Sequence, residues 1–201
     1  MSAKILVIPG SLRTGSHNAR LAALAAKELT LLDADVTRIS LADFPLPIYD
    51  ADLEVKTGVP ANAAKLKQMI GQHAGVFIAC PEYNASVTPV LKNTIDWVSR
   101  VREKGEPPLA VFRNRVFALG AASPMIYGGM RSIMAMRQVL EVGCGALVVP
   151  EFVAVPRAEQ AFDEKDELIE PRAAAALRTM LNRLIEMARL VGVNDVAMVG
   201  V

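Results

Sequence analysis

The sequence predicts an open α/β fold in three layers, with five parallel strands in the order 2-1-3-4-5 between two layers of helices. Five short apolar segments alternate with segments of helical periodicity. Strands that are apolar on both faces are typical of a parallel sheet covered on both sides. The right-handed crossover rule and this strand count favour the order 2-1-3-4-5. The chain of 201 residues is long enough for one such domain, so residues 1–201 are expected to form a single domain.

The first half of the chain supplies the first three strands. Residues 4–8 are expected to form strand one, and residues 17–32 a helix in which leucine and alanine recur every three or four positions. Residues 35–41 alternate and are rich in β-branched side chains, which indicates a second strand with one face less buried. Residues 42–60 contain three prolines and are expected to be a long loop over the end of the sheet.

The remaining elements follow the same alternation of helix and strand. Pro89 suits the first turn of a helix, because proline lacks an N–H that would be unpaired there. The expected elements are a helix at 61–72, a third strand at 75–79, a helix at 88–101, a polar connector at 102–114, a fourth strand at 115–120, a helix at 130–142, a fifth strand at 145–149 that resumes over 152–155, and a last helix at 163–193.

Three loops follow the carboxyl ends of strands one, three and four, at residues 10–18, 81–87 and 122–129. Ligands in open parallel sheets bind beyond these ends, at the point where the strand order reverses. The three loops are therefore expected to converge on one binding site.

The first loop has the composition of a phosphate site. Ser11, Thr14 and Ser16 bring hydroxyls, Asn18 a carboxamide and Arg13 a guanidinium, immediately before a helix N-terminus. The loop has no Gly-Lys-Ser/Thr ending and no Gly-x-Gly-x-x-Gly, which argues against an NTPase or dinucleotide loop. An alternative interpretation is a helix that is simply capped by Ser16, beside a solvated arginine.

Composition excludes several classes of protein. Apolar residues make up 52% of the chain, which excludes disorder, and a net charge of +1 gives no reason to expect nucleic acid as a partner. No apolar run is long enough for a membrane span, and no signal peptide is recognisable. The two cysteines, Cys80 and Cys144, form no disulfide framework, so a reducing cytoplasm is the expected setting. Both are expected to be buried and inert, and no metal-ligand spacing is present.

Four motifs stand out from the rest of the sequence: Gly-Ser-Leu-Arg-Thr-Gly-Ser-His-Asn at 10–18, Pro-Glu-Tyr-Asn at 81–84, Leu-Lys-Asn-Thr-Ile-Asp-Trp at 91–97, and Ser123-Pro124 with Gly128-Gly129. In these motifs the chain resembles the NAD(P)H-dependent FMN reductases of flavodoxin-like fold, which include quinone, chromate and azo reductases. The resemblance extends from residue 4 to about residue 150.

The resemblance implies a set of cofactor-binding residues around FMN. Ser11, Arg13, Ser16 and Asn18 would hold the phosphate, and His17 would either contact it or only begin the helix. Pro81, Glu82, Tyr83 and Asn84 would line the isoalloxazine ring, although this stretch could also be an ordinary turn. Ser123, Gly128 and Gly129 would close the far side.

The implied activity is hydride transfer from NADPH or NADH to FMN, and on to a quinone, azo compound, metal oxyanion or free flavin. The chemistry is that of the cofactor, so no catalytic side chain and no metal is expected. Two alternatives remain open, a flavodoxin-type electron carrier and a non-catalytic flavin-binding module. The resemblance also implies a homodimer or homotetramer.

Several single residues carry narrower expectations. Glu82 has no proton-transfer role and could be merely solvated, and Tyr83 either stacks near the flavin or packs under its loop. Trp97 is expected in the core or at a subunit contact, and His73 at the surface. Arg100, Arg102 and Arg131 are candidates for binding the 2′-phosphate of NADPH. The apolar tail, residues 194–201, either packs against a neighbour or frays.

Overall fold

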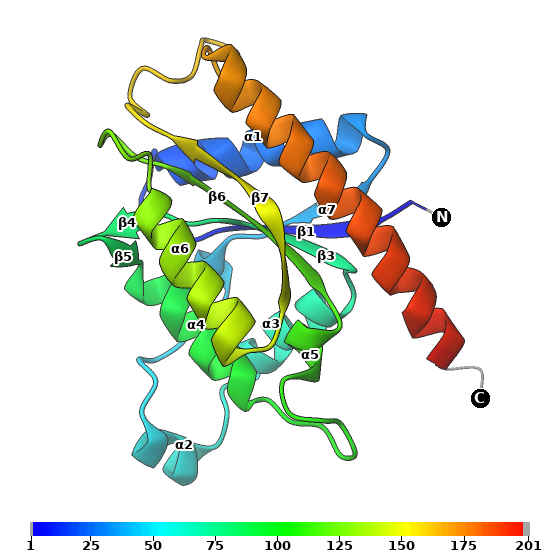
Figure 1. The fold of residues 1–201 in the computed structure, drawn as a ribbon. Helices are drawn as coiled ribbons and strands as arrows, with labels where there is room; N and C mark the ends of the chain where they lie inside the picture. Colours follow the sequence, from blue (N-terminus) through cyan, green and yellow to red (C-terminus); the bar gives the residue numbers. More distant parts are fainter. Residues whose placement is uncertain (1, 199–201) are drawn as a thin grey trace.

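The computed structural model describes residues 2–198, and the side chains up to residue 191. It contains the predicted parallel sheet of five strands, in the order β2-β1-β3-β6-β7 (Figure 1). In order of the chain this is 2-1-3-4-5, so the predicted order is confirmed. The strands are β1 (Lys4–Pro9), β2 (Asp35–Arg38), β3 (Gly75–Ala79), β6 (Val116–Ala122) and β7 (Leu147–Val155).

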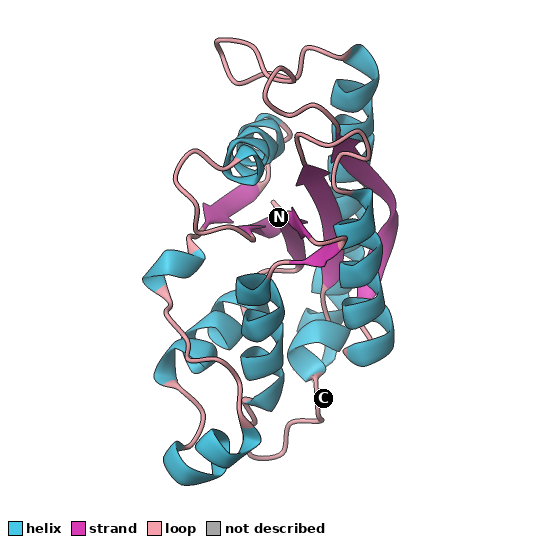
Figure 2. Ribbon diagram, turned by 90° about the vertical axis from the view of Figure 1, so that its left-hand side faces the viewer, coloured by secondary structure: helices cyan, strands magenta, loops and turns pink. Residues whose placement is uncertain are grey.

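Helices cover both faces of the sheet, and alternate side chains of each strand pack into a different helix layer. Ile5 and Val7 of β1 belong to the core formed with α1 (His17–Leu31) and α7 (Pro171–Met198). Leu6 and Ile8 belong to the core on the other face. That face is covered by α3 (Ala61–Gly71), α4 (Pro89–Arg100) and α6 (Met130–Gln138). Figure 2 shows the strands lying between these helices.

The central strands end in register at one edge. Pro9 of β1 pairs with Ala79 of β3, which pairs with Gly120 of β6. The loops after these strands therefore leave the sheet side by side, as the sequence predicts.

The segment 42–60 differs from the predicted loop. It contains the helix α2 (Ala51–Thr57), and a 3₁₀ turn (Leu41–Asp43) lies at its start. The strand β2 ends before this turn, at Arg38, and is therefore shorter than expected. Asp50 is the N-cap of α2, and its carboxylate accepts a hydrogen bond from the N–H of Asp52 at 2.8 Å. Trp97 of α4 lies fully buried beneath this segment, and its indole N–H donates to the carbonyl of Pro47 at 2.7 Å. Trp97 is therefore a core residue.

The predicted start of the last helix is wrong. The helix α7 begins at Pro171 rather than at residue 163. The Asp163 carboxylate instead accepts from the backbone N–H groups of Lys165 and Glu167, which closes a local turn before the helix. Residues 156–170 thus form a non-helical excursion after β7.

Smaller departures concern short elements that periodicity does not resolve. The connector 102–114 ends in a single helical turn, α5 (Ala110–Arg113). The helix α6 continues as a π-helical turn over Val139–Gly143. The two apolar pieces of the fifth strand form one strand, β7, with an irregular register against β6 between Phe117 and Leu119.

His73 is buried, contrary to the expected surface position. Its Nδ1 lies 2.6 Å from the carbonyl oxygen of Met69, and its Nε2 lies 2.9 Å from the Thr37 hydroxyl. Cys80 and Cys144 are buried free thiols, as expected. Burial raises the pKa of the Cys80 thiol, and raises that of Cys144 to about 11, so neither is a thiolate at neutral pH.

Among the described helices, none is both long and apolar enough to cross a membrane. The predicted alternatives for the tail at 194–201 lie outside the residues whose side chains the structure describes.

A fold prediction follows from the packing at Gly120. A Cβ atom there would lie 2.8 Å from Val153 Cγ1 and 3.0 Å from the ring of Phe77. We expect Gly120→Ala to lower the free energy of unfolding by about 1–3 kcal/mol, because overpacking a rigid core forces its neighbours apart. Gly143→Ala is the matched control, since a Cβ there meets nothing within 4 Å. Urea unfolding of both variants measures the difference, and equal stability would contradict the packing described.

Candidate functional site

A cavity of about 370 Å³ opens at the edge where β1, β3 and β6 end. Its size falls in the range of small-molecule sites. Its walls come from the loops after four strands. The lining residues are Ser11, Arg13, Ser16, His17, Asn18, Pro81, Glu82, Tyr83, Ala122, Ser123, Pro124 and Glu159. Nine of the twelve predicted site residues are therefore brought together.

A larger cavity of about 630 Å³ lies between β7 and the start of α7. Its lining is mostly apolar and includes no residue of the loops after β1 and β3. The smaller cavity is the better candidate site, because it collects the polar groups of three converging loops at the position where such sheets bind ligands.

The loop after β1 presents unpaired donors to the cavity. The Arg13 guanidinium forms no ion pair with any carboxylate among the described residues. Ser16 precedes α1 in an extended conformation and is 3% exposed, yet its hydroxyl makes no capping hydrogen bond. The interpretation of Ser16 as a side-chain cap is therefore wrong. Both groups remain available for a ligand.

Asn18 lines the cavity but is already engaged with the protein. Its Nδ2 donates to the carbonyl of Ala122 at 2.7 Å, and its Oδ1 accepts from the Ala122 N–H at 3.0 Å. The residue is 4% exposed. The carboxamide thus joins α1 to the end of β6 and shapes the cavity, and the second Nδ2 hydrogen is left for the predicted contact with a phosphate.

His17 is the first residue of α1 and has a buried Nδ1 with no hydrogen-bond partner among the described groups. Burial lowers the pKa of His17, and the positive charge of Arg13 lowers it further. Glu159 opposes this effect and Arg20 adds to it. Burial and the two arginines therefore favour the neutral imidazole.

The Pro-Glu-Tyr-Asn stretch forms a tight hairpin. From the sequence, an ordinary turn was the alternative to a stretch that lines the flavin ring. The strands β4 (Glu82–Tyr83) and β5 (Ser86–Val87) pair antiparallel. Asn84 and Ala85 both have positive φ, at 50° and 64°, as the two turn positions of such a hairpin require. Pro81, Glu82 and Tyr83 line the cavity. Asn84 lies at the exposed tip and is not among the lining residues, so its predicted contact with the ring stays a prediction.

Glu82 is held in an ion pair rather than solvated. Its carboxylate accepts from the Arg131 side chain at 2.7 Å and from the Arg131 backbone N–H at 3.1 Å. The Glu82 side chain is only 5% exposed. This pair fixes the hairpin to the N-terminus of α6. Tyr83 lines the cavity and is 50% exposed, so it is not buried under the loop.

Gly128 and Gly129 do not line the cavity, contrary to expectation. Both have positive φ and form the turn before α6. A Cβ on Gly128 would lie 2.8 Å from the backbone of Val155, and one on Gly129 would lie 2.6 Å from Ala121 Cβ. Their role is close packing against the ends of β6 and β7. Ser123 does line the cavity, and its hydroxyl accepts from the Met125 N–H at 3.2 Å.

Three lining residues were missed by the sequence analysis: Ala122, Pro124 and Glu159. Ala122 and Pro124 flank the predicted Ser123. Glu159 lies in the excursion after β7, which also leaves the carboxyl end of a strand, and this signal could have identified it. Among the described residues, no group of three His, Cys, Asp or Glu side chains is placed to hold a metal ion.

Comparison with known sequences relates this site to one family. The sequence pattern of the family described as "NADPH-dependent FMN reductase" matches residues 3–160. The chain is 39% identical to the quinone reductase of Escherichia coli over 158 residues, which is 76% of this chain and 79% of that protein. It is 33% identical to an NAD(P)H-dependent FMN reductase of Pseudomonas aeruginosa over 183 residues, 90% of this chain and 92% of that one.

Solved structures share the fold. FerB, a flavoenzyme NAD(P)H:(acceptor) oxidoreductase from Paracoccus denitrificans, superimposes with a TM-score of 0.72 at 22% identity, over 93% of this chain and 97% of its own. An oxidoreductase from Corynebacterium diphtheriae gives a TM-score of 0.64 at 18% identity, over 94% and 97% of the two chains. The flavodoxin-like fold is thereby confirmed. From the extent of the family match and the identity to its relatives, the chain belongs to the NADPH-dependent FMN reductase family.

Proposed function

We propose that the cavity holds FMN and that the protein uses it to carry two electrons from NAD(P)H to a quinone-type acceptor. The observation that carries this proposal is the unpaired Arg13 guanidinium beside the free Ser16 hydroxyl, at the N-terminus of α1. A phosphate ester with nearly two negative charges requires such a set of donors. Family membership supports FMN as the molecule that carries this phosphate.

The residues present fit the phosphate end of FMN. Ser11, Arg13 and Ser16 would donate to the phosphate oxygens together with the first N–H groups of α1. Asn18 would fix this helix end against Ala122, with its second Nδ2 hydrogen left for the phosphate. The buried Nδ1 of His17 has no hydrogen-bond partner among the described residues, so a polar ligand beside this residue would alter its electrostatic environment.

The hairpin and the loop after β6 fit the ring end. Pro81, Glu82 and Tyr83 would lie along one edge of the isoalloxazine, with Ser123 and Pro124 on the opposite wall. The Arg131 ion pair holds the hairpin rigid, so its backbone N–H groups would be placed in advance to stabilise negative charge on the ring.

FMN, when bound, supplies a centre that accepts a hydride from NAD(P)H and returns two electrons to an acceptor. The protein contributes binding and orientation, since no lining side chain is needed as an acid or base. Tyr83 lines the cavity and is half exposed, so NAD(P)H and the acceptor would bind in turn on this solvent-accessible side.

A quinone is the acceptor that the relatives favour, because several of them are named quinone reductases or NADPH:quinone oxidoreductases. Azo compounds, metal oxyanions and free flavin are the alternative electron acceptors to be assayed beside a quinone. The same relatives favour an enzyme over an electron carrier or a non-catalytic module. Of the candidates for the 2′-phosphate of NADPH, Arg100 is paired with Glu54 and Arg131 with Glu82, so neither is free.

The wider proposals concern the whole chain. We propose that residues 1–201 act as one FMN-binding domain in the cytoplasm, as a homodimer or homotetramer. An exposed apolar set beside the cavity supports self-association, because large apolar side chains at a binding edge are commonly covered by a partner. This set comprises Tyr83, Met125, Ile126, Tyr127, Met130 and Met134.

The first test concerns Arg13. We expect Arg13→Ala to weaken FMN binding by about 1.5–3 kcal/mol, because it removes a charged hydrogen bond to the phosphate. Quenching of flavin fluorescence measures the affinity, and Arg189→Ala, an exposed arginine on α7, is the control. Riboflavin affinity should not respond to Arg13→Ala. An unchanged affinity for FMN would remove Arg13 from the site.

The second test concerns activity. Mixing the FMN-loaded protein with NADH or NADPH in a stopped-flow instrument should bleach the visible absorbance of the oxidised flavin. Subsequent addition of a benzoquinone should restore the absorbance. Failure of both nucleotides to bleach it would end the enzyme proposal, and recovery only with a partner protein would favour an electron carrier.

The third test concerns assembly. Light scattering at micromolar concentration should give at least the mass of a dimer, about twice the 21.6 kDa of one chain. Ile126→Lys and Met130→Lys, which place charge in the apolar set, should shift the mass toward the monomer. A monomeric wild-type protein would contradict the proposed assembly.

A further inference from the structure

His17 occupies an unusual electrostatic position in the proposed phosphate site. It lies at the start of α1 in the wall of the cavity that Arg13 and Glu159 also line. A carboxylate is unexpected beside a phosphate, because the two anions repel each other. A titratable group between them offers a reason for its presence.

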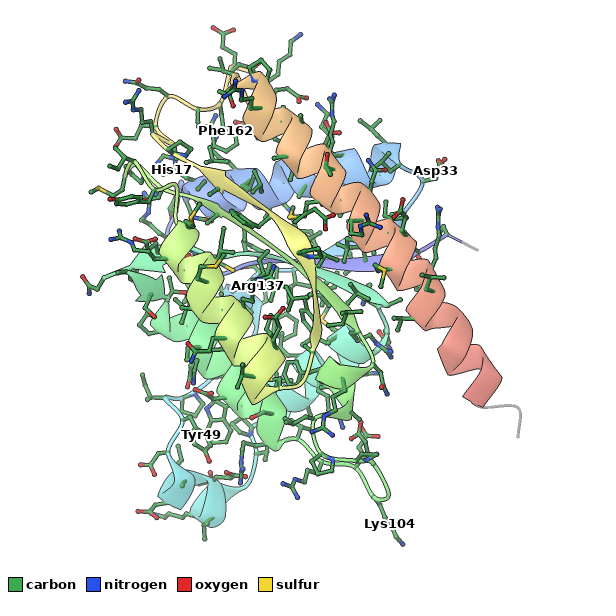
Figure 3. The ribbon with its side chains drawn as sticks, in the orientation of Figure 1. His17, Asp33, Tyr49, Lys104, Arg137 and Phe162 are labelled. Atoms are coloured by element: carbon green, nitrogen blue, oxygen red, sulfur yellow. The ribbon has the colours of Figure 1, made fainter. Side chains whose placement is uncertain are left out.

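The excursion at residues 156–170 is docked on α1, which holds Glu159 at the cavity. The Arg20 side chain of α1 donates to the Asp166 carboxylate at 2.7 Å, and its guanidinium lies 4.7 Å from the ring centre of Phe162. Lys27 of α1 forms an ion pair with Glu167. Figure 3 shows Phe162 next to the end of α1 that begins with His17.

We propose, on the basis of the FMN site proposed above, that binding of the FMN phosphate is coupled to uptake of one proton by His17, with Glu159 as the second anion that favours the imidazolium. The proton comes from solvent and is added to the ring nitrogen that is unprotonated in the neutral imidazole. No covalent bond to the ligand forms or breaks.

The charges around His17 explain why the free protein lacks this proton. Arg13 precedes it in the loop, and Arg20 follows it on α1, where Asp166 partly neutralises it. Glu159 lines the same cavity from the excursion and favours the charged form, and Glu82 on the hairpin is already paired with Arg131. Burial and the two arginines together outweigh Glu159, so the pKa of His17 lies below its usual 6.5.

A bound phosphate reverses this balance. It adds nearly two negative charges next to a single histidine, and pairs with the Arg13 charge that had opposed protonation. The pKa of His17 therefore rises in the complex. Between the free and the bound pKa, binding takes up a proton, so FMN affinity falls as pH rises through that window. Below the free pKa the imidazole is charged in both states, and the coupling disappears.

The chain allows a direct measurement, because it contains only two histidines. NMR titration of the imidazole protons gives the pKa of each, and His73, which is buried between Met69 and Thr37, is an internal reference. We expect saturation with FMN to raise the pKa of His17 by more than one unit and to leave His73 unchanged. Riboflavin, which lacks the phosphate, should leave the titration of His17 unchanged. An unchanged His17 pKa with FMN bound would overturn the proposal.

Binding affinity gives an independent readout. From pH 6.5 to 8.5 the second ionisation of the phosphate, with a pKa of about 6, is largely complete and cannot mimic the effect. We expect the Kd of FMN to increase severalfold over this interval in the wild type, because the proton held by His17 in the complex is lost as the pH rises through its bound pKa. His17→Gln should abolish this slope and Glu159→Gln should reduce it. Glu164→Gln, an exposed glutamate in the same excursion, should keep it.

The outcomes separate the two proposals. If FMN binds with equal pH dependence in the wild type and in His17→Gln, the proton coupling is wrong while the FMN site stands. If FMN does not bind at any pH, both are wrong. If Glu164→Gln reduces the slope as much as Glu159→Gln does, the effect is one of overall charge and the assignment to Glu159 fails.

Discussion

The candidate site depends on one pair of hydrogen bonds, between the Asn18 carboxamide and the backbone of Ala122. These bonds join residues 104 positions apart and fix the start of α1 against the end of β6. Neighbouring bonds complete the frame: the Gly10 N–H donates to the Ala79 carbonyl, and the Thr88 hydroxyl donates to the Gly10 carbonyl. Buried bonds of this kind are costly to break, so the three loops keep a fixed geometry.

Ion pairs between different elements hold together the parts of the molecule around the site. Arg20, Arg100, Arg131 and Arg178 each meet a carboxylate on another element. These pairs attach the excursion to α1, α2 to α4, the hairpin to α6, and α7 to α1. Arg13 has no such partner among the described residues. A cation left unpaired at a helix N-terminus is suited to an anionic ligand and contributes little to the fold.

Two irregular segments give the site its surroundings. The segment 42–60 is held on α4 by Trp97, whose indole donates to Pro47, and by the edge-on contact between Tyr49 and Trp97 at 5.0 Å. The excursion at 156–170 is held on α1 and brings Glu159 to the cavity. The first stabilises the helix layer beneath the site, whereas the second changes the charge inside it. A phosphate site that contains a histidine and a glutamate is sensitive to pH, unlike one built from serine and arginine alone.

The sequence by itself determined the sheet order, the two helix layers and the convergence of the loops after β1, β3 and β6, because these follow from apolar periodicity and from the geometry of parallel strands. It also identified Ser11, Arg13, Ser16, His17, Pro81 to Tyr83 and Ser123 as residues of one cavity. Only the tertiary structure decided which polar groups were free. The Asn18 carboxamide is hydrogen-bonded to the backbone of Ala122, and the Glu82 carboxylate is paired with Arg131. Gly128 and Gly129 are required for close packing. Glu159 reaches the cavity from an excursion that was not predicted. The physical reason is that a motif specifies which groups are present locally, whereas their pairing depends on partners distant in the chain.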